Sequence, residues 1–149
     1  VDYICGRFEV TGKQISKELA ERICQIADNH SSYVQQLAWL VWIHTDKLAT
    51  EQDLEAAYQD IIDQNTPLFE KQTESLTTYQ MNFLRAIIDG VHSEFTTQEI
   101  IHKYQLGSSA NVSIVKRALV KKELIEIEKR RVVIPDPIMK VWLKKELGI

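Results

Sequence analysis

Residues 96–134 read TTQEIIHKYQLGSSANVSIVKRALVKKELIEIEKRRVVI and contain the change of pattern that decides the fold. Apolar residues first recur at helical spacing, in a short segment and then, after a turn at Gly107, in a longer one. After Leu124 the period falls to two, because Ile125 and Ile127 alternate with glutamates. Short helix, turn, longer helix and β-hairpin in this order predict a helix-turn-helix with a wing.

Capping residues predict where the helices of this motif begin. Thr77 with Gln80, and Thr96 with Glu99, each have the spacing of a capping box. Ser108 or Ser109 is expected to start the longer helix. Its predicted core positions are Val112, Ile114, Val115, Ala118 and Leu119. Lys129-Arg130 is predicted to form a tight, basic tip between two strands, and a last helix follows Pro135-Asp136-Pro137.

Residues 1–73 are predicted to form a separate helical subdomain. Thr50 and Asp53 have the pattern of a helix start, and we expect Asn65-Thr66-Pro67 to break that helix. Residues 1–73 carry a net charge of −6 and residues 74–149 one of +3. The predicted fold is mainly α, with a helical, lid-like subdomain at 1–73 and a winged helix-turn-helix with one β-hairpin at 74–149.

The composition is that of a soluble globular protein. Hydrophobic residues make up 44% and charged residues 26% of the 149 positions, and no apolar run is long enough to span a membrane. Cys5 and Cys24 fall on apolar helix faces and are expected to be buried thiols of a cytoplasmic protein.

Catalytic motifs are missing from the sequence. It has no Gly-x-x-x-x-Gly-Lys-Ser/Thr loop to hold nucleotide phosphates, no Gly-x-Ser-x-Gly and no His-Glu-x-x-His. The two cysteines and four histidines have no metal-ligand spacing. We therefore expect no catalytic residue, no metal site and no cofactor in this chain.

Three segments resemble a family of bacterial and archaeal AAA/STAND-type ATPases. They are residues 29–40 (NHSSYVQQLAWL), 73–80 (TESLTTYQ) and 106–112 (LGSSANV), and their order matches along nearly the whole chain. The resemblance implies a P-loop ATPase core upstream that binds ATP and Mg²⁺, followed by this lid and winged helix. The chain starts at Val1 without an initiator Met, which suggests a fragment of such a protein.

The resemblance also implies a nucleotide-contacting turn at Asn29, His30 and Ser31. The glycine and proline found at that turn in related lids are missing here, as is the arginine that many such lids aim at the γ-phosphate. A helix N-terminus suits anions, so His30 is a candidate contact. The alternative is a histidine that only caps a helix.

Seven residues of the winged helix are candidates for DNA contact. At 100° per residue, the side of the longer helix opposite Val115 includes cations and a serine, and the hairpin adds three more cations. The candidates are Ser113, Lys116, Arg117, Lys121, Lys129, Arg130 and Arg131. Cations suit phosphates, and Ser113 or Arg117 could reach base edges. Winged helices also dock proteins, so DNA and protein remain equal alternatives.

Two other functions remain open on the sequence. One is a free-standing winged-helix transcription regulator whose helical first half mediates dimerisation. The other is a protein-interaction adaptor. Tyr33, Trp39 and Trp42 are expected to lie in the core or to contact the ATPase core.

Overall fold

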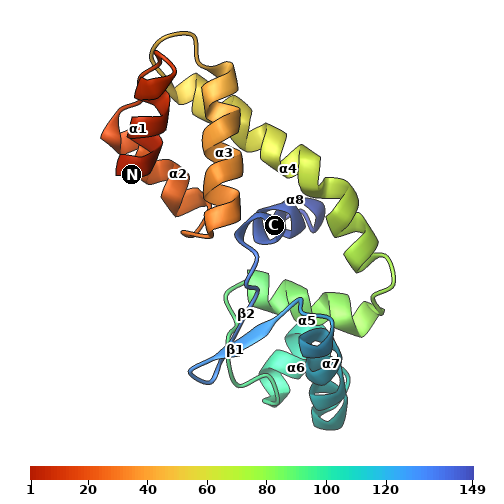
Figure 1. The fold of residues 1–149 in the computed structure, drawn as a ribbon. Helices are drawn as coiled ribbons and strands as arrows, with labels where there is room; N and C mark the ends of the chain where they lie inside the picture. The colour runs from red at the N-terminus through yellow and green to blue at the C-terminus, as the bar shows by residue number, and fades with distance from the viewer. The chain divides into compact units, whose positions relative to one another are not determined.

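The computed structural model describes all of residues 1–149, which divide into two compact units, Val1–Pro67 and Leu68–Ile149. The chain forms eight helices and one antiparallel hairpin (Figure 1). The predicted fold class, mainly α with one β-hairpin, is therefore confirmed.

The first unit contains α1 (Asp2–Val10), α2 (Lys17–Ile26), α3 (Ser31–His44) and most of α4 (Glu51–Thr73). α2 packs against both α1 and α3. Ser16 caps α2, because its side chain accepts a hydrogen bond from the Leu19 amide. The core of this unit consists chiefly of Ile4, Phe8, Ile23, Leu37, Val41, Leu54, Ala57 and Ile61.

The expected break at Pro67 is wrong, because α4 runs through that residue as far as Thr73. Pro67 has no N–H to bond the Asp63 carbonyl, and its ring crowds that same carbonyl. Asp63 is exposed, so water can satisfy that carbonyl. The side chains of Asn65 and Thr66 donate to backbone carbonyls one turn earlier, as residues within a helix do. The boundary between the two compact units along the chain falls after Pro67, within the residues of α4, whereas the sequence suggested a boundary between residues 73 and 74.

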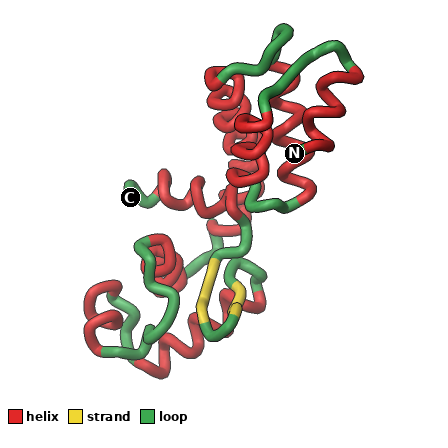
Figure 2. Tube along the Cα trace, turned by 90° about the vertical axis from the view of Figure 1, so that its left-hand side faces the viewer, coloured by secondary structure: helices red, strands yellow, loops and turns green.

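The second unit contains α5 (Thr78–Ile88), α6 (Gln98–Tyr104), α7 (Ser109–Lys121), β1 (Glu126–Glu128), β2 (Arg131–Val133) and α8 (Pro137–Glu146). α5 packs against α6, α7 and α8, and the two strands lie beside each other (Figure 2). Its core includes the stacked rings of Phe83 and Phe95, with centroids 4.4 Å apart. The order helix, short helix, longer helix, hairpin is the one that the sequence predicts.

Most of the predicted caps are present. Thr77 and Gln80 form both hydrogen bonds of a capping box at the start of α5, and the Ser108 side chain caps α7. The predicted start of α6 is wrong by one residue, because Thr97 rather than Thr96 accepts the capping hydrogen bond, from the Ile100 amide. The spacing to Glu99 pointed to Thr96, but α6 begins at Gln98, which makes Thr97 the N-cap.

The hairpin has the predicted two-residue tip. Glu128 pairs with Arg131 across the strands, so Lys129 and Arg130 alone form the turn. Both have positive φ angles, 49° and 68°, which is the conformation of the mirror-image turns that match the twist of a hairpin.

Burial corrects expectations for α7, for the cysteines and for the aromatic group. Ile114 was expected in the core of α7 and is exposed, while Ala118 is only half-buried. Ile127 is exposed although Ile125, two residues earlier, is buried. Cys5 and Cys24 are free thiols but half-buried rather than fully buried, because each lies at the edge of its helix's apolar face. Trp39 is largely exposed, and Tyr33 and Trp42 are half-buried, so this aromatic group is not core.

Candidate nucleic-acid interface

α7 turns one side to solvent and the other to the core of its unit. Val112, Val115 and Leu119 are buried, and their directions define the inward side of the helix. At 100° per residue, Arg117 lies close to the centre of the opposite side. The other exposed residues of this side, here called the α7 face, are Ala110, Ser113, Ile114, Val120 and Lys121. α7 contains no acidic residue, so no carboxylate of its own opposes a phosphate there.

Three candidates from two different elements line one groove. A groove of about 190 Å³ is lined by Ser113 and Lys116 of α7 and by Arg130 of the hairpin, and also by Thr96 and Val132. Lys116 is half-buried beside this groove rather than fully outward as expected. The structure thus brings polar side chains of the helix and of the wing to the same groove.

The remaining candidates extend this surface in both directions. Arg117 and Lys121 lie on the exposed side of α7, and Lys129 and Arg131 are exposed on the hairpin. All seven candidate residues therefore belong to the second unit and have solvent access, partial for Lys116.

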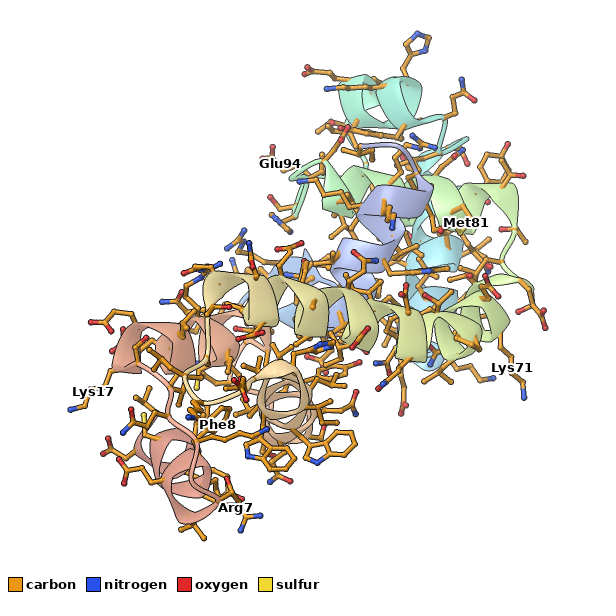
Figure 3. All side chains as sticks on the ribbon, turned by 90° about the horizontal axis from the view of Figure 1, so that it is seen from above. Arg7, Phe8, Lys17, Lys71, Met81 and Glu94 are labelled. Atoms are coloured by element: carbon orange, nitrogen blue, oxygen red, sulfur yellow. The ribbon has the colours of Figure 1, made fainter.

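Carboxylates interrupt the positive charge in two places. Glu94, which Figure 3 labels, belongs to the loop between α5 and α6 and lines the same groove as Lys116 and Arg130. Glu126 and Glu128 are exposed on β1, and Glu128 lies directly opposite Arg131. The surface is basic but mixed, which limits its net attraction for a polyanion.

Asn29, His30 and Ser31 form an exposed turn in the first unit. Asn29 has a left-handed φ of 57°, His30 is the N-cap of α3, and Ser31 is the first residue of that helix. The His30 side chain makes no capping hydrogen bond, and the first turn of α3 has no acidic residue. The three candidates are adjacent and reachable by solvent, and no other candidate residue belongs to this unit.

A second surface feature of the first unit is a groove of about 400 Å³ between α1 and α3, lined by Tyr3, Arg7, Phe8, Trp39 and Trp42 among others. Figure 3 labels Arg7 and Phe8 on α1. The Trp42 indole donates a hydrogen bond to the Thr11 hydroxyl over 2.7 Å, and the Lys13 ammonium lies 3.9 Å from the Trp42 ring centroid. These contacts fix the Trp42 side of the groove.

One residue of the α7 face, Ile114, was expected in the core and is exposed instead. Helix geometry contained the signal, because Ile114 lies 200° around the helix from Val112. Ile114 was expected in the core because it is hydrophobic, although its angle on the helix points outward.

A family model described as a probable winged helix domain matches residues 67–145. This match covers just over half of the chain. The chain belongs to this winged-helix family. Comparisons with curated proteins and with solved structures give no match. The matched region begins at Pro67, one residue before the second compact unit, and it includes α7 and the hairpin. None of the helices has both the length and the apolar character that crossing a membrane requires.

Proposed function

We propose that the winged-helix unit binds duplex DNA, with α7 in the major groove and the hairpin along the phosphate backbone. The observation that supports this most directly is the groove shared by Ser113, Lys116 and Arg130, because it makes one surface of helix and wing. Arg117 at the centre of the α7 face adds a cation where a recognition helix meets DNA. A protein partner is the alternative for the same surface.

Different side chains of this surface suit different parts of the DNA. Lys121, Lys129 and Arg131 are exposed cations towards the ends of this surface, and Arg130 borders its groove; all four suit phosphate oxygens. Such contacts set affinity and register but carry no sequence information. Ser113 and Arg117 lie nearer the middle, where base edges would be.

Fluorescence anisotropy with the full chain and a labelled duplex at low salt tests the proposal. With roughly three to five phosphates neutralised, a plot of log affinity against log salt has a slope of about −3 to −5. Exchanging both Arg130 and Arg131 for alanine flattens this slope by about two units and weakens binding to all sequences alike.

The matched control is the double exchange Lys144→Ala and Lys145→Ala, which removes two exposed cations from α8 instead. It leaves the slope close to that of the unaltered chain. No binding at tens of micromolar protein in low salt overturns the DNA function, and protein docking then becomes the preferred role of this surface.

The helical unit is further proposed to be the lid of a P-loop ATPase whose core lies upstream. The resemblance of residues 29–40 to such lids supports this, and the exposed turn at Asn29, His30 and Ser31 is compatible with nucleotide contact. On this proposal ATP and Mg²⁺ bind the upstream core, and this chain by itself is not an enzyme. The rival proposals are a free-standing regulator that dimerises through the helical unit, and an adaptor.

The coding sequence upstream of Val1 separates these proposals. A Gly-x-x-x-x-Gly-Lys-Ser/Thr loop after a predicted strand supports the ATPase. An initiator Met directly before Val1 overturns it. In that case, sedimentation of the chain as a dimer favours the regulator and sedimentation as a monomer favours the adaptor.

A further inference from the structure

We infer that Ile114 makes the α7 face prefer thymine, through contact with the C5-methyl group that thymine presents in the major groove. This inference rests on the proposed DNA binding and adds to it the base that the helix reads.

Ile114 has no structural reason to be apolar. It is 61% exposed, whereas the flanking branched residues of the same helix, Val112 and Val115, are almost completely buried. A large aliphatic side chain in water gains free energy from any surface that covers it, by an amount proportional to the apolar area removed from water. Nothing in the chain supplies that cover.

The position of Ile114 along α7 favours a base over a phosphate. Ala110, Ile114, Arg117 and Lys121 have the spacing of one row along the exposed side of the helix. The first two are uncharged and apolar and the last two are cations. Because the rise is 1.5 Å per residue, about 10 Å separates Ile114 from Lys121 along the axis.

A recognition helix contacts base edges with its N-terminal residues. The uncharged half of the row is this N-terminal half, so Ile114 lies where base edges would be, and Lys121 at the other end lies towards the backbone. The C5-methyl of thymine is the apolar group among the hydrogen-bonding atoms that the bases present in the major groove. An aliphatic side chain at this position therefore selects thymine.

The neighbouring side chains contribute less discrimination. Ser113 can donate or accept and suits several bases. Ala110 is too short to reach far into the groove. Val120 is also exposed, at 40%, but lies nearly two turns nearer the C-terminus of α7. Exchanging Val120 for alanine therefore controls for a general loss of apolar surface.

Two labelled duplexes with the same sequence test the inference: one alternates adenine and thymine, and the other carries deoxyuridine in place of every thymine. They have equal charge and the same base-pair hydrogen bonds, and differ in the C5-methyl group alone. The full chain is expected to bind the thymine duplex about fourfold more tightly, the equivalent of burying one methyl group. Ile114→Ala abolishes the difference without changing the salt slope, whereas Val120→Ala keeps the difference.

The outcomes separate the inference from the DNA function. Equal affinity of the unaltered chain for both duplexes, or a thymine preference that persists in Ile114→Ala, overturns the role of Ile114 but leaves DNA binding standing. Failure to bind either duplex at low salt overturns the DNA function and the inference together. Both residues are exposed, so α7 is expected to remain folded in the two variants, and circular dichroism checks this.

Discussion

His92 and Val132 are joined by two hydrogen bonds across 40 residues of sequence. The Val132 amide donates to the His92 carbonyl over 2.8 Å, and the His92 Nδ1 lies 2.9 Å from the Val132 carbonyl oxygen. A carbonyl oxygen can only accept, so Nδ1 carries the proton. These bonds tie β2 of the hairpin to the loop that follows α5, and they hold the wing beside the helices of its unit.

Exchanging His92 for alanine is expected to loosen the wing. The variant loses the side-chain bond but keeps the backbone bond, which corresponds to a loss of about 1 kcal/mol in the free energy of unfolding. Urea denaturation followed by circular dichroism measures this loss. Asparagine places an amide donor near the position of Nδ1, so His92→Asn should recover part of it.

His102→Ala provides the control for this prediction, because His102 is an exposed histidine on α6. It should leave the free energy of unfolding within a few tenths of 1 kcal/mol of the unaltered chain. Equal stability of the His92→Ala and His102→Ala variants would contradict the anchoring role.

Replacing Lys129-Arg130 by Asn-Gly is expected to change stability and DNA affinity in opposite directions. Both residues hold positive φ angles, which side chains other than those of glycine, asparagine and aspartate adopt at a cost. Asn-Gly suits such a turn and should raise the free energy of unfolding by about 1 kcal/mol. Thermal unfolding measures this gain, and anisotropy measures the weaker DNA binding that follows from two lost cations.

The matched control exchanges both residues for glutamine, which removes the charges and keeps the strained backbone. It should weaken DNA binding as much as Asn-Gly does, without the gain in stability. If the Asn-Gly variant is no more stable than the glutamine variant, the turn stores no strain that glycine relieves.

The winged helix could be predicted from sequence because several local signals agree. The capping box at Thr77, the turn at Gly107 and the change of period after Leu124 each specify one element, and their order specifies the motif. These signals act over a few residues and need no knowledge of the tertiary contacts. The seven candidate DNA contacts are on this motif, and their solvent exposure follows from the same periodicity, except at the half-buried Lys116.

The remaining errors arise where tertiary contacts override a local rule. Pro67 disfavours a helix locally, yet α4 continues through it. Phe69, beyond the proline, is completely buried, and the free energy of this burial offsets the lost hydrogen bond. Hydrophobic character likewise predicted burial of Ile114, although its angle on the helix did not. The groove shared by Lys116 and Arg130 joins elements far apart in the sequence, and no spacing rule predicts it.

Alkaline pH is expected to destabilise the second unit through Tyr104. Its hydroxyl donates to the Asp89 carboxylate over 3.0 Å. Burial first, and then the hydrogen bond and charge of Asp89, raise the pKa of Tyr104 above its ordinary value of 10.0. In the window above pH 10 the unfolded chain has lost this proton while the folded chain keeps it, so stability falls as pH rises and is fully present below that window.

Tyr104→Phe removes this contribution. The variant should be less stable at neutral pH by about 1 kcal/mol, because the hydrogen bond is lost. Its stability should then decline less steeply above pH 10 in urea titrations at successive pH values. Burial and the charge of Glu55 also raise the pKa of Tyr58 in the first unit, so part of the decline remains when the whole chain is measured. Tyr3→Phe, at an exposed position, is the control, and an equally steep decline in the Tyr104 and Tyr3 variants would refute the assignment.

The last turn of α4 is expected to be essential to the winged-helix unit, although it precedes the sequence boundary at residue 74. The Phe69 side chain is completely buried, and its ring centroid lies 5.6 Å from that of Trp142 on α8. A fragment of residues 75–149 lacks Phe69, whereas a fragment of residues 67–149 retains it. Loss of a buried phenylalanine costs about 3–5 kcal/mol, a large part of the stability of a small domain.

The 67–149 fragment should therefore unfold cooperatively in urea, and the 75–149 fragment should unfold at much lower urea or not fold at all. Phe69→Ala within 67–149 separates the side chain from the rest of the deleted turn, and it should reproduce most of the loss. Lys71→Ala, on the exposed side of the same turn, should leave the midpoint nearly unchanged. Equal urea midpoints for the two fragments would place the start of the domain after α4. A stable 67–149 fragment beside an unstable 75–149 fragment would instead make the end of this helix part of the winged-helix core, because Phe69 then completes the apolar surface on which Trp142 packs.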